Sequence, residues 1–207
     1  MKLYYSPGAC SLSPHIVLKE AGLTFTAERV DLKTHKTSSG AQLKNVSAKD
    51  YVPILELDNG ERLTEGPAIV QYLADQRPDS KLAQPAGSFE RYRLQEWLNF
   101  ITSELHKSFY PLFHREVTSV EWQKAMEAKI AAKFDFVSAQ LGNRDYLFGE
   151  QFTIADAYLF TVLNWTFFVE IDLARWPVLA RYHARVAARP SVKDALRDEG
   201  LLRAEAA

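Results

Sequence analysis

The sequence predicts an α/β fold followed by an all-helical one. β-rich runs alternate with helical patterns as far as Gln76. The next stretch, RPDSKLAQPAGS, is rich in Pro, Gly, Ser and charged residues, which is typical of a linker between packed units. After it, apolar residues recur only with the spacing of helices. We therefore expect domains at residues 1–80 and 88–207, joined by a linker at residues 81–87.

The first domain is predicted to have the element order β-α-β-α-β-β-α. It begins with a β-rich run at residues 2–6 and a helix at about residues 11–21. Gly22 marks the end of that helix, because glycine readily takes the left-handed conformation that follows a helix. A second β-rich run at residues 25–32 and a polar, weaker helical stretch at residues 37–44 come next.

A hairpin and a helix complete this domain. Residues 54–57 and 62–64 flank Asp58-Asn59-Gly60, and a turn of residues that tolerate positive φ is a strong hairpin signal. The last helix begins at Gly66-Pro67, with proline in the first turn, where its missing N–H costs nothing.

The second domain is predicted from helical spacing. Thr153-Ile154-Ala155-Asp156 has the spacing of an N-capping box, with Asp in place of the usual Glu or Gln, and it precedes the longest apolar run. Helices are expected at residues 89–114, 120–141, 154–170 and 177–188, with a short one after Ser191.

Composition narrows the class of function. Lys and Arg total 25 and Asp and Glu total 26, so no excess charge draws the chain to nucleic acid or to an anionic membrane. The longest apolar run, at residues 157–169, is too short to cross a bilayer. The N-terminal stretch lacks the apolar centre of a secretory signal. With a single cysteine no intrachain disulfide can form, and we expect a cytoplasmic protein that binds a small molecule.

Cys10 is the first candidate catalytic residue. It lies between the first predicted strand and the first predicted helix, where unpaired N–H groups and the helix dipole favour a thiolate. A lone cysteine is more often a small buried apolar residue, but the turn and the helix start favour the functional interpretation. Because Ser13 stands three residues on, there is no C-x-x-C pair, and any redox cycle would need an external thiol.

Two further motifs of the first domain have both a structural and a binding interpretation. Val52-Pro53 is either an ordinary trans proline that opens a strand, or a cis bond that turns the Val52 backbone outward to pair with an extended peptide ligand. Glu65 stands beside a helix N-terminus. It either caps that helix, or marks a place where bare N–H groups hold a ligand carboxylate.

His106 is the second candidate catalytic residue. A helical wheel places it on a polar face, apart from the apolar positions of the predicted helix at residues 89–114. A polar face usually meets solvent, and the alternative is a wet cleft against the first domain. In such a cleft a neutral histidine would take a proton from a thiol or donate a hydrogen bond to the thiolate. The wheel groups His106 with Gln95, Asn99, Thr102, Ser103 and Tyr110.

Metal and nucleotide sites have no support in the sequence. The other histidines lack metal-ligand spacing, and a single cysteine excludes a thiolate-rich zinc site, so we predict no metal. Neither G-x-G-x-x-G nor G-x-x-x-x-G-K occurs. Aromatic residues are expected mainly in the core, with some available to line an apolar substrate pocket. They are Phe109, Tyr110, Phe113, Trp165, Phe167 and Phe168.

Four segments together resemble the cytosolic glutathione transferases, and specifically their bacterial beta class. The resemblance covers nearly the whole chain. It implies a thioredoxin-like N-terminal domain, an all-helical C-terminal domain that contributes the hydrophobic substrate site, and a homodimer with its active sites near the subunit interface. The segments are MKLYYSPGACSLSPH, VPILELDNGERLTEGPAIVQYLAD, EWLNFITSELHKSF and FTIADAYLFTVLNW.

The resemblance also implies the residues of the site. Cys10 would contact glutathione and form a mixed disulfide with it, and Val52, before a cis Pro53, would pair with the cysteinyl part. Glu65 and Gly66 would hold the γ-glutamyl end. Asp156, in the capping box, would be structural. The second domain would complete the site with Asn99, Ser103, Glu104, Leu105 and His106.

Two positions depart from the family pattern. Relatives usually carry Asn-Pro-x-Gly where this chain has Ser47-Ala48-Lys49-Asp50, in a loop that flanks the glutathione site. His35 stands where relatives usually have a lysine that contacts the glycyl carboxylate. Lys33 or Lys36 would be the alternative contact, and a contact through His35 would depend on pH.

The resemblance favours the first of three hypotheses about function. In the first, the protein adds glutathione to hydrophobic electrophiles, with Cys10 and His106 acting on the sulfur of the bound tripeptide. In the second, Cys10 is itself the nucleophile of a glutathione-dependent thiol-disulfide oxidoreductase or reductive dehalogenase. In the third, the protein is a non-catalytic module that binds glutathione.

Overall fold

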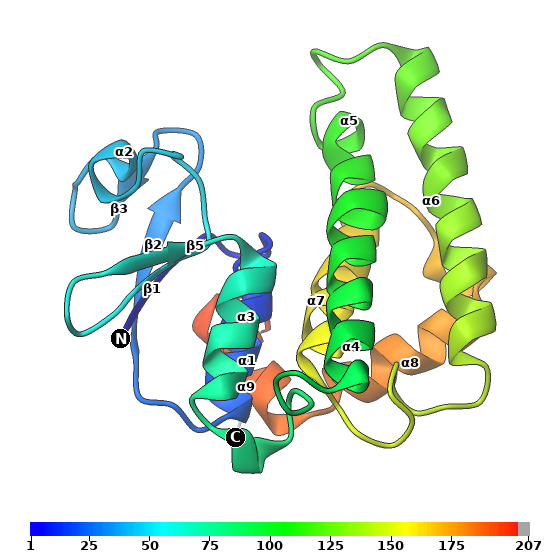
Figure 1. The fold of residues 1–207 in the computed structure, drawn as a ribbon. Coiled ribbons are helices and arrows are strands. Elements are labelled where there is room, and N and C mark those ends of the chain that lie inside the picture. Colours follow the sequence, from blue (N-terminus) through cyan, green and yellow to red (C-terminus); the bar gives the residue numbers. More distant parts are fainter. Residues whose placement is uncertain (203–207) are drawn as a thin grey trace, which may run out of the picture. The chain divides into compact units, whose positions relative to one another are not determined.

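A computed structural model describes residues 1–202 and shows two compact units (Figure 1). Unit 1 comprises Met1–Ala83 together with residues 188–202, and unit 2 comprises Gln84–Ala187. The predicted fold class, an α/β part followed by a helical part, is confirmed. Residues 188–202, which the sequence assigned to the helical domain, pack with unit 1 instead. Residues 203–207 of that predicted domain lie outside the described part.

Unit 1 is built on a five-stranded mixed sheet with the strand order β3-β2-β1-β4-β5. β1 pairs in parallel with β2, and the other neighbours are antiparallel. The parallel pair requires a crossover, which the intervening helix supplies. The strands are β1 (Lys2–Tyr5), β2 (Thr26–Asp31), β3 (Lys36–Thr37), β4 (Ile54–Glu56) and β5 (Arg62–Thr64), so the predicted hairpin is confirmed.

The helix predicted at residues 37–44 is wrong in its first half. Thr37 ends strand β3, where it pairs with Val30, and only Leu43–Val46 is helical, as α2. The Thr37 hydroxyl accepts a hydrogen bond from the Ala41 N–H at 3.1 Å, so it closes a tight turn instead of continuing a helix. Gly40 has a φ of 91° within this turn. Local side-chain bonding and strand pairing therefore outweigh a weak helical pattern.

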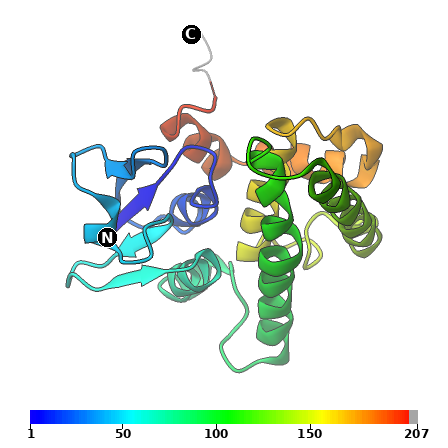
Figure 2. The same ribbon diagram turned by 90° about the horizontal axis from the view of Figure 1, so that it is seen from above.

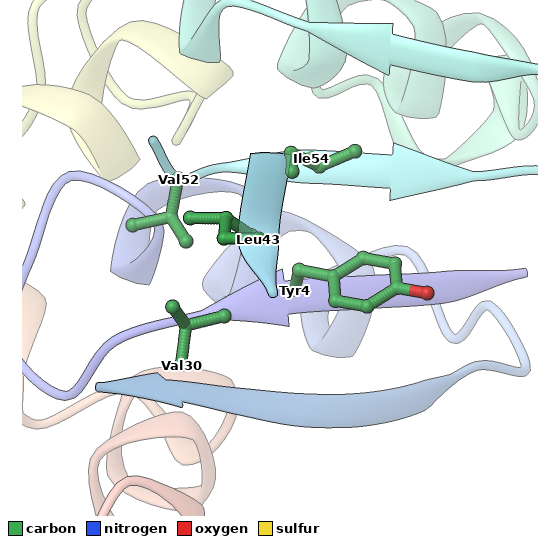
Figure 3. Packing of buried hydrophobic residues seen from close by; sticks show 5 residues of the cluster. All are labelled: Tyr4, Val30, Leu43, Val52 and Ile54. Carbon is green, nitrogen blue, oxygen red and sulfur yellow. The ribbon is translucent and has the colours of Figure 1, made fainter. Parts of the chain in front are cut away.

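Helices cover both faces of the sheet. α1 (Leu12–Glu20) and α3 (Gly66–Asp75) lie on one face, and α2 lies on the other (Figures 1 and 3). Gly22 takes a φ of 62° after α1, as predicted. A small apolar core fills the space beneath α2 and stabilises it (Figure 3). Its buried members are Tyr4, Val30, Leu43, Val52 and Ile54.

The last helix of the described chain, α9 (Pro190–Asp198), packs on α1 within unit 1. Its apolar face buries Val192, Ala195 and Leu196. At its start, the Arg189 guanidinium forms an ion pair with Glu20 at the end of α1. Sequence periodicity shows that a helix is amphipathic but not which surface it covers, which is why this placement was not predicted.

Unit 2 is a bundle of helices (Figure 2), in which α7 packs against α4 and α8. Every residue of α7 except Asn164 is buried. The helix predicted at residues 154–170 ends at Asn164 and continues as a 3-10 turn, where the Thr166 hydroxyl donates to the Leu163 carbonyl at 2.6 Å. The α-helices are α4 (Phe89–Phe100), α5 (Tyr110–Phe113), α6 (Val120–Leu141), α7 (Ile154–Asn164) and α8 (Pro177–Ala187).

Asp156 in the first turn of α7 is a fully buried carboxylate. One oxygen accepts from the Leu147 N–H at 2.9 Å and from the Tyr182 hydroxyl at 3.0 Å. The other accepts from the N–H and the hydroxyl of Thr153, each at 2.9 Å. Burial nevertheless dominates these donors and raises the pKa of Asp156 to about 6.

This raised pKa predicts a pH-dependent term in stability. Below pH 3.8 the carboxyl is protonated in both states, and as the pH rises toward 6 the unfolded chain loses its proton first. The stability that the proton gives the fold is therefore lost as the pH rises through that range, by about 2 kcal/mol between pH 4.5 and 6.5. Urea unfolding of the wild type and of Asp156→Asn at these two pH values measures it as a double difference. Equal pH dependence in the two proteins would contradict the prediction.

Candidate functional site

Cys10 lies in the turn that joins β1 to α1, two residues before the first residue of that helix. Its thiol is partly exposed and donates a hydrogen bond to the Val52 carbonyl at 3.4 Å. Ser11 holds the turn locally, because its hydroxyl accepts from the Ser6 N–H at 3.1 Å and donates to the Ser6 carbonyl at 3.2 Å. The Cys10 thiol is therefore fixed in position and accessible, and Cys10 is not a small apolar residue of the core.

The Val52-Pro53 bond is cis, as in the second of the two alternatives that the sequence left open, and pairing of the Val52 backbone with a ligand stays a prediction. The Val52 side chain belongs to the apolar core beneath α2, while its carbonyl accepts from Cys10. Two of the predicted site residues, Cys10 and Val52, are thus in direct contact although they are far apart in the sequence. The backbone around Val52 is anchored by its side chain and meets the thiol through its main chain.

Glu65 immediately precedes α3 and has a φ of 70°. Its carboxylate accepts from the Lys49 ammonium at 2.6 Å and from the Tyr51 hydroxyl at 2.5 Å. It makes no side-chain capping bond to α3, so the simple capping interpretation fails. The hydrogen bond to Glu65 raises the pKa of both Lys49 and Tyr51. Gly66 follows as the first residue of the helix.

His35 contacts the same loop that supplies Lys49. Its Nδ1 lies 3.0 Å from the Asp50 carboxylate, and both residues have positive φ. The two departures from the family pattern, His35 and the loop at residues 47–50, are therefore one structural feature. Lys49 of the loop pairs with Glu65, and Asp50 of the loop pairs with His35. All four side chains are between about a third and a half exposed, so these pairs are weak enough for a charged ligand to replace.

In unit 2, the helix predicted at residues 89–114 is not continuous. α4 ends at Phe100 and is followed by a π-helical segment, Ile101–Leu105, and a 3-10 turn, His106–Phe109. The Thr102 hydroxyl donates to the carbonyl four residues earlier at 2.7 Å, and so does the Ser103 hydroxyl at 3.0 Å, which competes with regular helix bonding. Such π segments are frequent at functional sites. The wider turn rotates the residues that follow, so a regular wheel does not place His106 correctly.

His106 packs against α7 and the turn after it. Its Nδ1 lies 2.6 Å from the Tyr158 hydroxyl, and its ring centroid lies 4.7 Å from that of Trp165, edge to face. Of the two placements that the sequence left open, the fully solvent-facing one does not apply, because the ring is half-buried among aromatic side chains. Tyr158 was not predicted as a functional residue. The sequence does hold one indication, because Tyr158 is the one tyrosine in the apolar run at residues 157–169. A buried tyrosine usually has a hydrogen-bond partner for its hydroxyl.

The other predicted residues of unit 2 lie in different surroundings. Asn99 and Ser103 are exposed and linked through the Ser103 hydroxyl. Glu104 accepts hydrogen bonds from Lys133 and Lys129 of α6 at 3.2 and 3.3 Å, which lower the pKa of its carboxyl. Leu105 is fully buried. Unit 1 thus carries Cys10, His35, Val52, Glu65 and Gly66, and unit 2 carries Asn99, Ser103, Glu104, Leu105 and His106.

Comparisons with known proteins agree with these motifs. The model "Glutathione S-transferase, N-terminal domain" matches residues 8–76, and "Glutathione S-transferase, C-terminal domain" matches residues 100–190. The glutathione S-transferase GstA of Escherichia coli O157:H7 is 47% identical over 201 residues, which cover 97% of this chain and all of GstA. The chain belongs to the glutathione S-transferase family.

Solved structures place it near the bacterial beta class. A beta-class glutathione S-transferase of Sphingomonas chungbukensis is 46% identical, with a TM-score of 0.93, over 98% of this chain and all of that one. A sphingomonad glutathione S-transferase complexed with glutathione has the same identity, TM-score and coverage. These values confirm the sequence resemblance to the beta class of the glutathione S-transferase family.

The described part of the chain has neither a membrane-spanning helix nor a cluster of metal-ligating side chains. No helix within residues 1–202 is long and apolar enough to cross a membrane. In the same part of the chain no group of three or more His, Cys, Asp or Glu side chains is arranged to hold a metal ion. That the protein works without a metal stays a prediction.

Proposed function

We propose that the protein is a cytoplasmic, homodimeric transferase that joins the thiol of glutathione to hydrophobic electrophiles. The observation that carries this proposal is the contact between the Cys10 thiol and the Val52 carbonyl, beside the cis Pro53. This contact places a thiol beside a backbone segment that opens a strand. A peptide ligand that contains a thiol would meet both, with its backbone along the strand and its sulfur near Cys10. The family relationship supports conjugation over the thiol-disulfide and non-catalytic alternatives.

Unit 1 would bind the tripeptide. Glu65 offers a carboxylate to the ammonium of the γ-glutamyl end, in exchange for its contact with Lys49, and Gly66 offers a helix N-terminus to the adjacent carboxylate. Val52 would pair with the cysteinyl backbone, and His35 would meet the glycyl carboxylate in place of Asp50. The exchanges would release the Lys49 ammonium and the Asp50 carboxylate, which are exposed enough for water to solvate them.

Unit 2 would assist the reaction. The thiol of glutathione loses its proton to His106 or to water, and the thiolate then attacks an electrophilic carbon and expels the leaving group. Tyr158 fixes the orientation of the imidazole through the hydrogen bond to Nδ1. Asn99, Ser103, Glu104 and Leu105 would shape this side of the site. Phe113, which is exposed and packs on the Trp165 ring beside His106, would supply apolar surface for the electrophile.

Conjugation of a chloronitrobenzene by two variants tests the assigned roles. We expect His106→Ala to lower kcat/KM by about tenfold, below the roughly 10²- to 10⁴-fold usual for general-base assistance, because thiols ionise readily without a base. Cys10→Ala should change the rate less, because the sulfur of glutathione and not that of Cys10 attacks. Tyr158→Phe keeps the ring and removes only the hydroxyl, so it should lower the rate by a smaller factor than His106→Ala.

Wild-type rates in both Cys10→Ala and His106→Ala would contradict the roles that we assign to these two residues.

Mass spectrometry of the intact protein after mixing with oxidised glutathione tests the second hypothesis, in which Cys10 is itself the nucleophile. A readily formed, reducible adduct on Cys10, combined with loss of activity in Cys10→Ala, would favour thiol-disulfide chemistry over conjugation. Binding of glutathione with no turnover of several electrophiles would favour a non-catalytic module.

A further inference from the structure

A buried carboxylate at the end of α9 joins three segments of unit 1. Glu199 is 5% exposed, and its Oε1 lies 2.9 Å from Nδ1 of His15, a fully buried residue of α1. Its Oε2 accepts a hydrogen bond from the Gly8 N–H at 2.8 Å. One side chain close to the C-terminus is therefore bonded both to the helix that follows Cys10 and to the turn that contains it. The proposed function uses neither Glu199 nor His15.

The bond to Gly8 fixes the turn from outside. Gly8 stands two residues before Cys10 and has a φ of 72°. Within the turn, Ser11 bonds locally with Ser6, and the Cys10 thiol donates to the Val52 carbonyl, 42 positions away. Glu199 adds a bond across 191 positions of sequence. Because a buried N–H without an acceptor is costly, the turn has a strong preference for the conformation that meets Glu199.

Contacts at both ends of α9 hold Glu199 in place. At the start of the helix, the Arg189 guanidinium and the Ser191 hydroxyl both bond to Glu20 of α1. At its end, Asp198 forms an ion pair with Lys19 at 2.6 Å. α9 is thus attached to α1 at each end. The carboxylate between α1 and the turn is positioned by the packing of a whole helix.

We propose that Glu199 is a positioning residue for Cys10, which holds the turn at residues 8–10 in the conformation that sets the reactivity of the thiol. A thiolate beside a helix start depends on N–H groups that are fixed in direction. Loosening the turn would spread these directions and weaken the stabilisation of the thiolate. The proposal concerns the protein without ligand and does not require that glutathione binds.

The negative charge of Glu199 and its hydrogen bond to Gly8 have opposite effects on the Cys10 thiolate. The charge disfavours the thiolate, whereas the bond favours it by holding the turn. A nearby negative charge disfavours a thiolate, so removing the charge alone would make Cys10 more acidic. The titratable groups that face Glu199 are His15 of α1, Tyr5 of β1 and Asp198 of α9, and Lys19 lies behind Asp198. Burial and then the Glu199 carboxylate raise the pKa of Tyr5. Two substitutions separate the charge from the bond.

Glu199→Asp keeps the charge but withdraws the carboxylate from Gly8, whereas Glu199→Gln keeps the reach and an acceptor oxygen but removes the charge. Asp194→Asn is the matched control, because Asp194 is an exposed carboxylate of α9 that pairs with Arg197 of the same helix, so the substitution removes a charge and keeps the Gly8 bond. The measurement is the rate of alkylation of Cys10 by iodoacetamide as a function of pH, with thermal unfolding of each variant recorded beside it. Cys10 is the only cysteine in the chain, so the signal has one source.

We expect Glu199→Asp to raise the midpoint of the alkylation profile by about half a pH unit or more, which slows alkylation at neutral pH about threefold. Glu199→Gln should lower the midpoint or leave it unchanged, and Asp194→Asn should leave it unchanged. A wild-type midpoint in Glu199→Asp with only a lower unfolding temperature would show a purely structural role and overturn the proposal. A higher midpoint of the alkylation profile in Glu199→Gln would overturn the proposal as well. This measurement can be made even if the Glu199→Asp variant does not fold.

Discussion

Glu65→Gln is expected to weaken glutathione binding by about 30-fold, the loss of roughly 2 kcal/mol that follows when a charge-assisted hydrogen bond becomes a neutral one. In the structure the Glu65 carboxylate already accepts from two donors, the Lys49 ammonium and the Tyr51 hydroxyl. It is therefore oriented before a ligand ammonium arrives. Glutamine keeps the shape of the side chain and presents an amide that no longer attracts a cation. Titration calorimetry with glutathione measures the change.

Glu61→Gln is the control for this prediction. Glu61 is an exposed carboxylate of the same unit and bonds with Asn59 in the hairpin turn. Its substitution changes the net charge by the same amount, so any general electrostatic effect on a charged ligand appears in both variants. An affinity for glutathione that falls equally in Glu61→Gln and Glu65→Gln would show that Glu65 has no direct contact with the ligand.

Asp156→Ala is expected to lower the free energy of unfolding by about 4 kcal/mol, because it leaves several buried donors without an acceptor. The carboxylate accepts from the Leu147 N–H, from the Tyr182 hydroxyl and twice from Thr153. Alanine replaces none of these contacts, and α7 is too closely packed for water to replace them. Urea unfolding followed by circular dichroism gives the value.

An exposed helix start provides the comparison. Ser119 caps α6 through a bond from the Trp122 N–H at 3.2 Å, in contact with solvent. Ser119→Ala should therefore cost only about 1 kcal/mol, because water satisfies the N–H that it leaves. If the Asp156→Ala and Ser119→Ala variants lost the same amount of stability, burial would not be the reason for the effect at Asp156.

Much of the fold was predictable because its signals are local. The turn at Asp58-Asn59-Gly60 and the proline after Gly66 each specify one backbone conformation, and the structure has both the hairpin and α3 where they indicate. β3 was missed because two residues on a sheet edge carry too little pattern to outweigh a helical one. The position of α9 was missed because its partner, α1, lies far away in the sequence.

The candidate site was predictable to a similar extent. The place of Cys10 before α1 follows from a strand, a turn and a helix start that are adjacent in the sequence. The surroundings of His106 do not, because the π-helical segment breaks the period on which a helical wheel depends. The pairs Lys49–Glu65 and His35–Asp50 were likewise beyond reach, since each joins a loop to a residue 15 or 16 positions away. Only folding brings such residues together.

The return of α9 to unit 1 has a consequence for synthesis on the ribosome. The surface of α1 that α9 covers has no cover until residues 190–198 have been made, so the first unit emerges early and is completed only after the second. Domains that can fold one after another during translation usually consist of one continuous segment. Here the second unit is enclosed in sequence by the first. A nascent chain halted before residue 188 would expose apolar surface that the finished protein hides, and it would be a natural substrate for chaperones.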